Sequence, residues 1–263
     1  MSDPGDASPI SDREDDPRRW LGSTPLLDLE DPKLRLRVRA LTQLSKTERE
    51  KALALYAFVK RIPFAKPFKM RLHTGREVLD AGRGDAPDKV TLLVAMLRLA
   101  RLPARIRYVS LRGEILRGLT TGVSQAARPV LEVWVHGQWL RTDTYIFDAA
   151  YMAAARQRLK DQGWEWGYGI HVGGAMLWDA LSSAYVGGFP TEQDPMVVED
   201  LGLYADPLAF VSSRAYRENH PRLARAVHWN VLAPGMERAI RDLRQDMEPG
   251  APSPSPAPSR KPT

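Results

Sequence analysis

The fold of this chain is decided by the stretch GRGDAPDKVTLLVAMLRLARLPARIRYVSL, residues 82–111. Pro87 suits the first turn of a helix, and Asp85 or Ala86 is placed to cap it. Apolar residues then cover most of the circumference of this predicted helix, which is typical of a central, buried helix. A proline follows the helical pattern, and residues 105–111 are then expected to form a strand.

Downstream, apolar and polar residues alternate on either side of His136-Gly137, a dipeptide typical of a hairpin turn. We expect one strand at about residues 130–135 and its partner at about residues 139–143. A buried helix followed by antiparallel strands predicts an α+β fold, with the central helix packed on an antiparallel sheet.

The segment before the central helix is expected to hold one further helix. It starts at Ser45, with Glu48 as the capping-box partner, and continues to Arg61, where Pro63 ends it. A loop is expected through residues 66–82.

The C-terminal part is expected to be mostly helical. A helix is predicted at about residues 149–161, and an aromatic, glycine-rich patch follows at 163–188. Further helices are predicted at about residues 207–217 and 221–246.

The absence of cysteine is the most informative feature of the composition. It excludes disulfides, thiolate metal sites and cysteine nucleophiles. No run of about 18 apolar residues occurs, so we predict no transmembrane helix. The acidic, polar start of the sequence does not resemble a signal peptide. A cytoplasmic location with no membrane partner is therefore expected.

The net charge of +6 conceals an asymmetry along the chain. Residues 1–31 carry nine acidic and three basic side chains, a net charge of −6, so the remaining residues carry +12. A basic body is able to attract nucleic acid. However, many of its arginines fall on predicted amphipathic helices, where a solvated face explains them. No nucleic-acid-binding module is recognisable either, so nucleic acid is not the partner we expect.

Three motifs in fixed order resemble the transglutaminase-like superfamily, whose core is related to that of papain-like cysteine proteases. The family pattern Gly-x-Gly-Asp-Cys-x-Asp-Lys stands here as GRGDAPDK, residues 82–89, and Arg-x-x-Gly-Ile-Pro-Ala-Arg stands as RLARLPAR, residues 98–105. The pattern His-x-x-x-Glu-Val, followed by Gly-x-Trp and an Asp, stands as RPVLEV and GQWLRTD within residues 128–143. The stretch GYGIHVGG, residues 167–174, is similar to a segment that follows the core in some bacterial members. The resemblance covers about residues 45–180.

The resemblance implies a single transglutaminase-like domain over residues 18–247. Its core is expected at about residues 45–150, and the mostly helical extension at 151–247. The acidic residues 1–17 and the proline-rich residues 248–263 are expected to be disordered ends, because they hold too few apolar side chains to form a core.

The resemblance also implies a catalytic triad, of which the nucleophile and the general base are missing here. Active members use Cys-His-Asp: a thiolate at a helix N-terminus attacks, the histidine is the base and the aspartate orients it. Mapped onto this chain, the three positions fall on Ala86, Arg128 and Asp143. Alanine has no nucleophilic atom, and arginine does not give up its proton. We therefore expect a natural pseudoenzyme in which only the orienting acid remains.

Other residues are poor substitutes for the lost groups. His136 falls in the predicted turn, and it is about 26 Å beyond Arg128 along an extended strand. Asp85 is better explained as a helix cap, and His171 as a packing or hydrogen-bonding residue of the glycine-rich patch. The remaining histidines have no metal-ligand spacing, so neither a metal nor a cofactor is expected. They are His73, His220 and His228.

The cleft is the feature that we expect to survive the loss of the catalytic groups. Arg128 and Asp143 are predicted to form an ion pair at the former His–Asp position. The candidate binding residues of the cleft are Asp85, Arg128, Trp139, Asp143 and His171. The leading hypothesis is a catalytically inactive transglutaminase-like protein that binds or regulates a protein or peptide partner through this cleft. The alternatives are a hydrolase of altered, non-cysteine mechanism and a basic nucleic-acid-binding protein.

Overall fold

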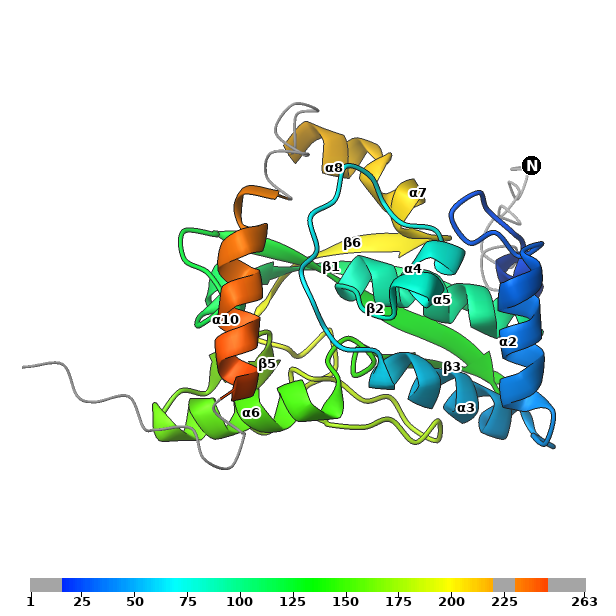
Figure 1. Ribbon diagram of the computed structural model, residues 1–263, viewed down its shortest axis with the longest axis horizontal. Helices are drawn as coiled ribbons and strands as arrows, with labels where there is room; N and C mark the ends of the chain where they lie inside the picture. Colours follow the sequence, from blue (N-terminus) through cyan, green and yellow to red (C-terminus); the bar gives the residue numbers. More distant parts are fainter. Residues whose placement is uncertain (1–15, 220–229, 246–263) are drawn as a thin grey trace, which may run out of the picture.

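The computed structural model describes residues 16–219 and 230–245. It has the predicted α+β architecture, in which helices pack on one four-stranded antiparallel sheet (Figure 1). The helices that precede the sheet in sequence are the 3-10 helix η1 (Pro17–Leu21) and the α-helices α2 (Pro32–Thr42), α3 (Glu48–Arg61), α4 (Gly75–Ala81) and α5 (Ala86–Leu99).

The sheet has the strand order β3-β2-β1-β6. Its strands are β1 (Ala104–Arg112), β2 (Gln125–Val135), β3 (Gln138–Thr142) and β6 (Val197–Tyr204), and the short 3-10 helix η2 (Gly113–Leu116) follows β1. The predicted hairpin joins β2 to β3 through His136 and Gly137, whose φ angles are 51° and 80°. Two positive φ angles are what a two-residue hairpin turn requires, and glycine adopts them without steric cost.

The central helix is α5, which lies against the sheet with α2, α3 and α4 around it (Figure 1). Its first turn is closed by a reciprocal pair of hydrogen bonds: the Asp85 carboxylate accepts from the Asp88 amide, and the Asp88 carboxylate accepts from the Asp85 amide. A run of residues from Leu92 to Leu97 has no exposed surface. Truncating one of these leucines to alanine is expected to cost about 2–5 kcal/mol, so this helix is a main source of stability.

The C-terminal extension is mostly helical, as predicted, but it also contributes a strand to the core sheet. Its remaining elements are α6 (Ala149–Asp161), the two-residue strands β4 (Trp166–Gly167) and β5 (Ile170–His171), α7 (Pro207–Val211), α8 (Arg214–Asn219) and α10 (Ala233–Gln245). Strand β6 pairs with β1 in antiparallel register, so core and extension share one sheet. Helix α10 crosses α6 (Figure 1). The apolar side chains of Met236, Ile240 and Leu243 on α10 are buried.

The N-terminal boundary of α3 differs from the prediction. Its capping box is formed by Thr47 and Glu50, not by Ser45 and Glu48. The reason is that the Thr47 hydroxyl accepts the Glu50 amide while the Glu50 carboxylate accepts the Thr47 amide, which satisfies two donors of the first turn.

A short helix lies where a loop was predicted. Helix α4 begins after Thr74, which forms a second capping box with Glu77, so the prediction of a continuous loop over residues 66–82 was wrong. Helix α2 and strand β6 were also not predicted.

The predicted helix at residues 207–217 is two short helices, α7 and α8. The predicted helix at 221–246 corresponds to α10 from Ala233 onward. Residues 1–15, 220–229 and 246–263 lie outside the described residues. Disorder was predicted for residues 1–17 and 248–263, but Asp16 and Pro17 are the cap and the first residue of η1.

Candidate functional site

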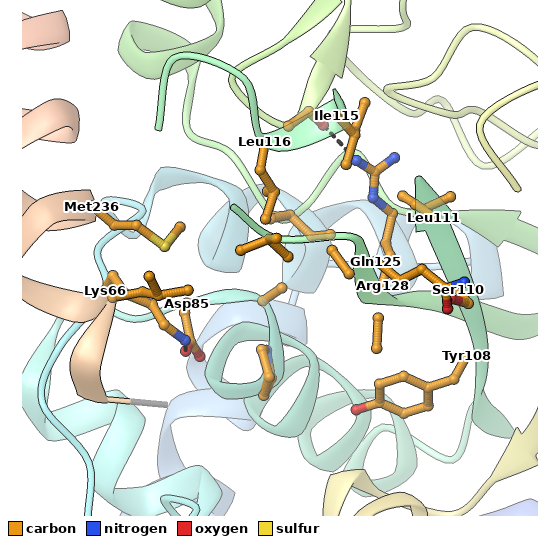
Figure 2. A pocket seen from close by; sticks show the side chains of 18 of the residues that line it. Lys66, Asp85, Tyr108, Ser110, Leu111, Ile115, Leu116, Gln125, Arg128 and Met236 are labelled. Atoms are coloured by element: carbon orange, nitrogen blue, oxygen red, sulfur yellow. Dashed lines mark hydrogen bonds and ion pairs between the residues drawn. The ribbon is translucent and has the colours of Figure 1, made fainter. Parts of the chain in front are cut away.

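A cavity of about 790 Å³ lies where the N-terminus of α5 approaches one end of β1 and of β2 (Figure 2). The segment between α3 and α4, together with α7, α8 and α10, contributes further walls. Ala86 and Arg128, the residues that the motifs align with the missing nucleophile and base, both line this cavity.

Ala86 is the first residue of α5, so it lies at the positive end of a helix dipole. The preceding residue, Asp85, is 3% exposed and contacts two ammonium groups. Its carboxylate lies 2.8 Å from Nζ of Lys66 and 2.5 Å from Nζ of Lys69. Burial opposes ionisation of Asp85, but Lys66 and Lys69 outweigh it and hold the pKa of this carboxyl well below its ordinary value.

Lys69 extends this group of charges to a second carboxylate. Its Nζ lies 2.6 Å from Oδ1 of Asp88, and Nδ1 of His73 lies 3.2 Å from the same oxygen. Burial, followed by the neighbouring charge of Asp85, raises the pKa of Asp88. We call Lys66, Lys69, Asp85 and Asp88 the charge cluster. The charge cluster lies next to Ala86, the position that the motifs align with the missing nucleophile.

The predicted ion pair at the second position is present. Nη1 of Arg128 donates to Oδ2 of Asp143 at 3.2 Å, and Nη2 donates to the carbonyl oxygen of Gly169 at 2.5 Å. The two charged side chains are 9% and 3% exposed. The other Asp143 oxygen accepts from the Val186 amide at 2.8 Å. Burial raises the pKa of Asp143, and Arg128 partly counteracts that effect. The base position is therefore held by a fixed cation that cannot accept a proton.

Three predicted binding residues do not line the cavity: Asp143, which lies behind Arg128, Trp139 and His171. Trp139 lies under the guanidinium of Arg105, 4.0 Å from the ring centroid, and beside Trp134. His171 pairs with Trp166 across β4 and β5, and its Nδ1 accepts from a neighbouring backbone amide. Burial is the main cause that lowers the pKa of His171.

The structure thus brings Asp85, Ala86 and Arg128 to one cavity, with Asp143 behind Arg128.

The lining residues that sequence reasoning missed include Lys66, Lys69 and Tyr108. The lysines lie in the segment predicted as a loop, and they meet Asp85 from 19 and 16 residues away. No local pattern reveals such a contact. Tyr108 could have been found from the sequence. It is two residues from Ile106 in a predicted strand, so the two side chains share the face that packs on the central helix.

Helix α10 and the residue Asn230 before it hold the segment that carries the two lysines. The side-chain amide of Asn230 accepts from the Lys69 amide at 2.8 Å and donates to the Lys69 carbonyl at 2.6 Å. The Glu237 carboxylate accepts from the Lys66 amide at 2.5 Å, and Met236 lines the cavity beside it. The C-terminal helix therefore closes one side of the cavity.

A second attachment fixes the other end of α10. Arg244 donates to both oxygens of Asp148, at 3.0 and 2.6 Å, and to the Phe64 carbonyl at 3.1 Å. Asp148 also caps α6, so one carboxylate joins α10, α6 and the segment after α3.

Within residues 16–219 and 230–245, no three His, Cys, Asp or Glu side chains are arranged to hold a metal ion. In the same ranges, no helix combines the length and the apolar character that crossing a membrane requires.

The chain is similar to solved structures that include the following two, and it spans less than half the length of each. One is described as a proposed cysteine protease from Cytophaga hutchinsonii, with 17% identity over 54% of this chain and 44% of that chain, at a TM-score of 0.40. The other is a proposed protease from Parabacteroides distasonis, with 19% identity over 44% of this chain and 24% of that chain, at a TM-score of 0.34. A comparison with curated proteins finds no match.

The sequence profile of the transglutaminase-like superfamily matches residues 36–144, which include all three triad-aligned positions and confirm the resemblance drawn from the motifs. Over these residues the chain forms a domain of the transglutaminase-like superfamily.

Proposed function

We propose that this chain is a catalytically inactive transglutaminase-like protein that acts as a binding or regulatory module through the cavity beside Ala86. The observation that carries the proposal is that the cavity is large enough for a ligand while its triad-aligned residues cannot act as nucleophile and base. The cavity measures about 790 Å³, a size typical of ligand sites, but its two triad-aligned residues are Ala86 and Arg128. One has no nucleophilic atom, and the other is a permanent cation held by Asp143.

The groups nearest to Ala86 also favour binding over catalysis. Asp85 is the carboxylate best placed to replace the nucleophile or the base, but both of its oxygens contact lysine ammonium groups. Its lowered pKa makes it a weak base near neutral pH. A hydrolase of altered mechanism would have to release Asp85 from Lys66 and Lys69 first.

The experiment compares the wild-type protein with Ala86→Trp, which fills the cavity from the first turn of α5. Ala150→Trp is the matched control, because Ala150 is exposed on α6 and does not line the cavity. All three proteins are melted to check the fold, and they are then used for quantitative capture of partners from native lysate and for peptide and ester turnover.

A partner that is retained by wild type and Ala150→Trp but lost by Ala86→Trp supports binding through the cavity. Identical partner sets for all three proteins contradict it. Turnover that disappears only in Ala86→Trp would replace the proposal with the hydrolase alternative.

A further inference from the structure

One polar group that faces the cavity has no partner. Tyr108 on β1 is 2% exposed and lines the cavity, and its hydroxyl makes no hydrogen bond to any residue within 16–219 or 230–245. Figure 2 shows the hydroxyl end of the ring directed toward the side of the cavity where Asp85 and Lys66 lie. Within the described residues, the hydroxyl oxygen is not among the fully buried polar atoms that lack a partner, so it is open to the cavity. This hydroxyl is therefore placed for a partner that enters the cavity.

The ring of Tyr108 is held rigidly, so its hydroxyl has a defined direction. It stacks on Phe210 with a centroid distance of 3.8 Å and an interplanar angle of 7°, and the edge of Tyr204 packs against it at 5.9 Å. Burial is the main cause that raises the pKa of Tyr108 well above its ordinary value. The phenol stays protonated at physiological pH and is available as a donor.

The wall around this hydroxyl is mostly apolar. Side chains that are almost fully buried line the cavity on several sides, including Ile115, Leu119, Ile146, Phe147, Phe210 and Met236. The polar lining residues Ser124, Gln125 and Glu199 are exposed, so the cavity opens to solvent on their side. A ligand that fits this distribution has an apolar body and an oxygen acceptor that reaches Tyr108.

Apart from the exposed Glu199, the charged side chains that line the cavity are already paired with an opposite charge. Lys66 and Lys69 contact Asp85, and Arg128 contacts Asp143. Ligand recognition at Tyr108 therefore needs an acceptor oxygen but no particular net charge. An acyl carbonyl satisfies this requirement, whether it belongs to a free carboxylic acid or to an ester.

We propose that the cavity binds an acyl ligand, whose apolar chain packs against the aliphatic and aromatic walls while its carbonyl oxygen accepts a hydrogen bond from the Tyr108 hydroxyl. This inference rests on the proposed function, because it names the ligand class of the same cavity.

The test is calorimetric titration of the full chain with octanoic acid and methyl octanoate. Both probes carry the acyl carbonyl, and they differ in charge. Tyr108→Phe removes only the hydroxyl and keeps the stack on Phe210. Tyr204→Phe is the matched control, because Tyr204 belongs to the same aromatic group but does not line the cavity, and its own hydroxyl donates to Leu201. Ala86→Trp checks that binding occurs in the cavity.

Wild type and Tyr204→Phe are expected to bind at least one probe with the same affinity. Tyr108→Phe is expected to bind that probe about threefold to tenfold more weakly, because it loses one hydrogen bond to the ligand. Tyr108→Phe should also melt no lower than wild type, since it loses no hydrogen bond to any residue that the structure describes. A purely structural role of the hydroxyl would instead lower the melting temperature and leave the affinity unchanged. Preference for one probe identifies the acyl source as free acid or ester.

Two results overturn the inference. In the first, Tyr108→Phe binds the probes as tightly as wild type. In the second, neither probe binds wild type although a partner sensitive to Ala86→Trp is captured, which leaves the proposed function standing. Loss of both probe binding and partner capture would reject the two together.

Discussion

Replacing Arg128 should lower the free energy of unfolding, because it leaves Asp143 as a buried carboxylate without its cation. Arg128→Met keeps much of the volume of the side chain but deletes the 3.2 Å contact with Asp143 and the 2.5 Å hydrogen bond to the Gly169 carbonyl. The remaining carboxylate is 3% exposed, so solvent compensates for little of the loss. Breaking a buried pair on one side costs about 3–5 kcal/mol, and we expect a loss in that range near neutral pH.

The size of this loss should depend on pH, with a sign that follows from Asp143. Burial already raises the pKa of Asp143 above its unfolded value, and loss of Arg128 raises it further. A raised pKa in the folded state gives stability that is complete at low pH and is lost as pH rises through the folded pKa. Arg128→Met loses more stability than wild type when Asp143 ionises. The difference in free energy of unfolding between the two proteins should therefore be smallest in acid, and it should grow as pH rises through the folded pKa of Asp143 in the variant.

The assay is urea denaturation of wild type, Arg128→Met, Asp143→Asn and the double variant, at about pH 4 and about pH 7. The double variant should recover much of the loss seen in Arg128→Met, since it leaves no buried charge unpaired. A loss below about 1 kcal/mol near neutral pH, or a loss that grows toward acid, would refute the buried ion pair.

Two further predictions address the alignment and the C-terminal helix. Ala86→Cys combined with Arg128→His should give a thiol that alkylates faster near neutral pH than an ordinary cysteine, because a helix N-terminus and an imidazolium stabilise the thiolate; an unreactive thiol in a well-folded protein would count against the alignment. Arg244→Met removes the bonds to Asp148, so amide hydrogen exchange should accelerate in α10 but not in α5, whereas the exposed control Arg241→Met should exchange like wild type. Equal acceleration of exchange in both helices would contradict a separate attachment of α10.

The elements predicted correctly are those with strong local patterns. Helix α5 has an almost continuous apolar surface and a proline in its first turn, and the β2–β3 hairpin has alternation around a glycine turn. Helix α6 occupies residues 149–161, as expected from its spacing. Helix α4 was missed because its seven residues are too few to establish a period. Strand β6 was missed because its burial does not alternate and its partner β1 is about ninety residues away in sequence.

The candidate site was predictable only in part, for a similar reason. Ala86 and Arg128, which the motifs single out, both line one cavity, and each could be named from sequence because each motif is continuous. The charge cluster and the aromatic stack beneath Tyr108 join segments far apart in the chain, so they depend on tertiary packing. Trp139 was proposed for the cleft from its place near Asp143 in the predicted hairpin, and proximity in sequence does not tell which face of a sheet borders a cavity.

The pairing of β6 with β1 means that the folded sheet extends beyond residues 36–144, the part of the chain that the family profile matches. A fragment ending near residue 144, where the family match stops, would leave β1 with a bare edge of amide and carbonyl groups. Such an edge is a template for strand exchange and aggregation. Any shortened form of the chain made to study the cavity, or any natural fusion that reuses this module, therefore has to extend at least through Tyr204 to keep the edge of β1 covered.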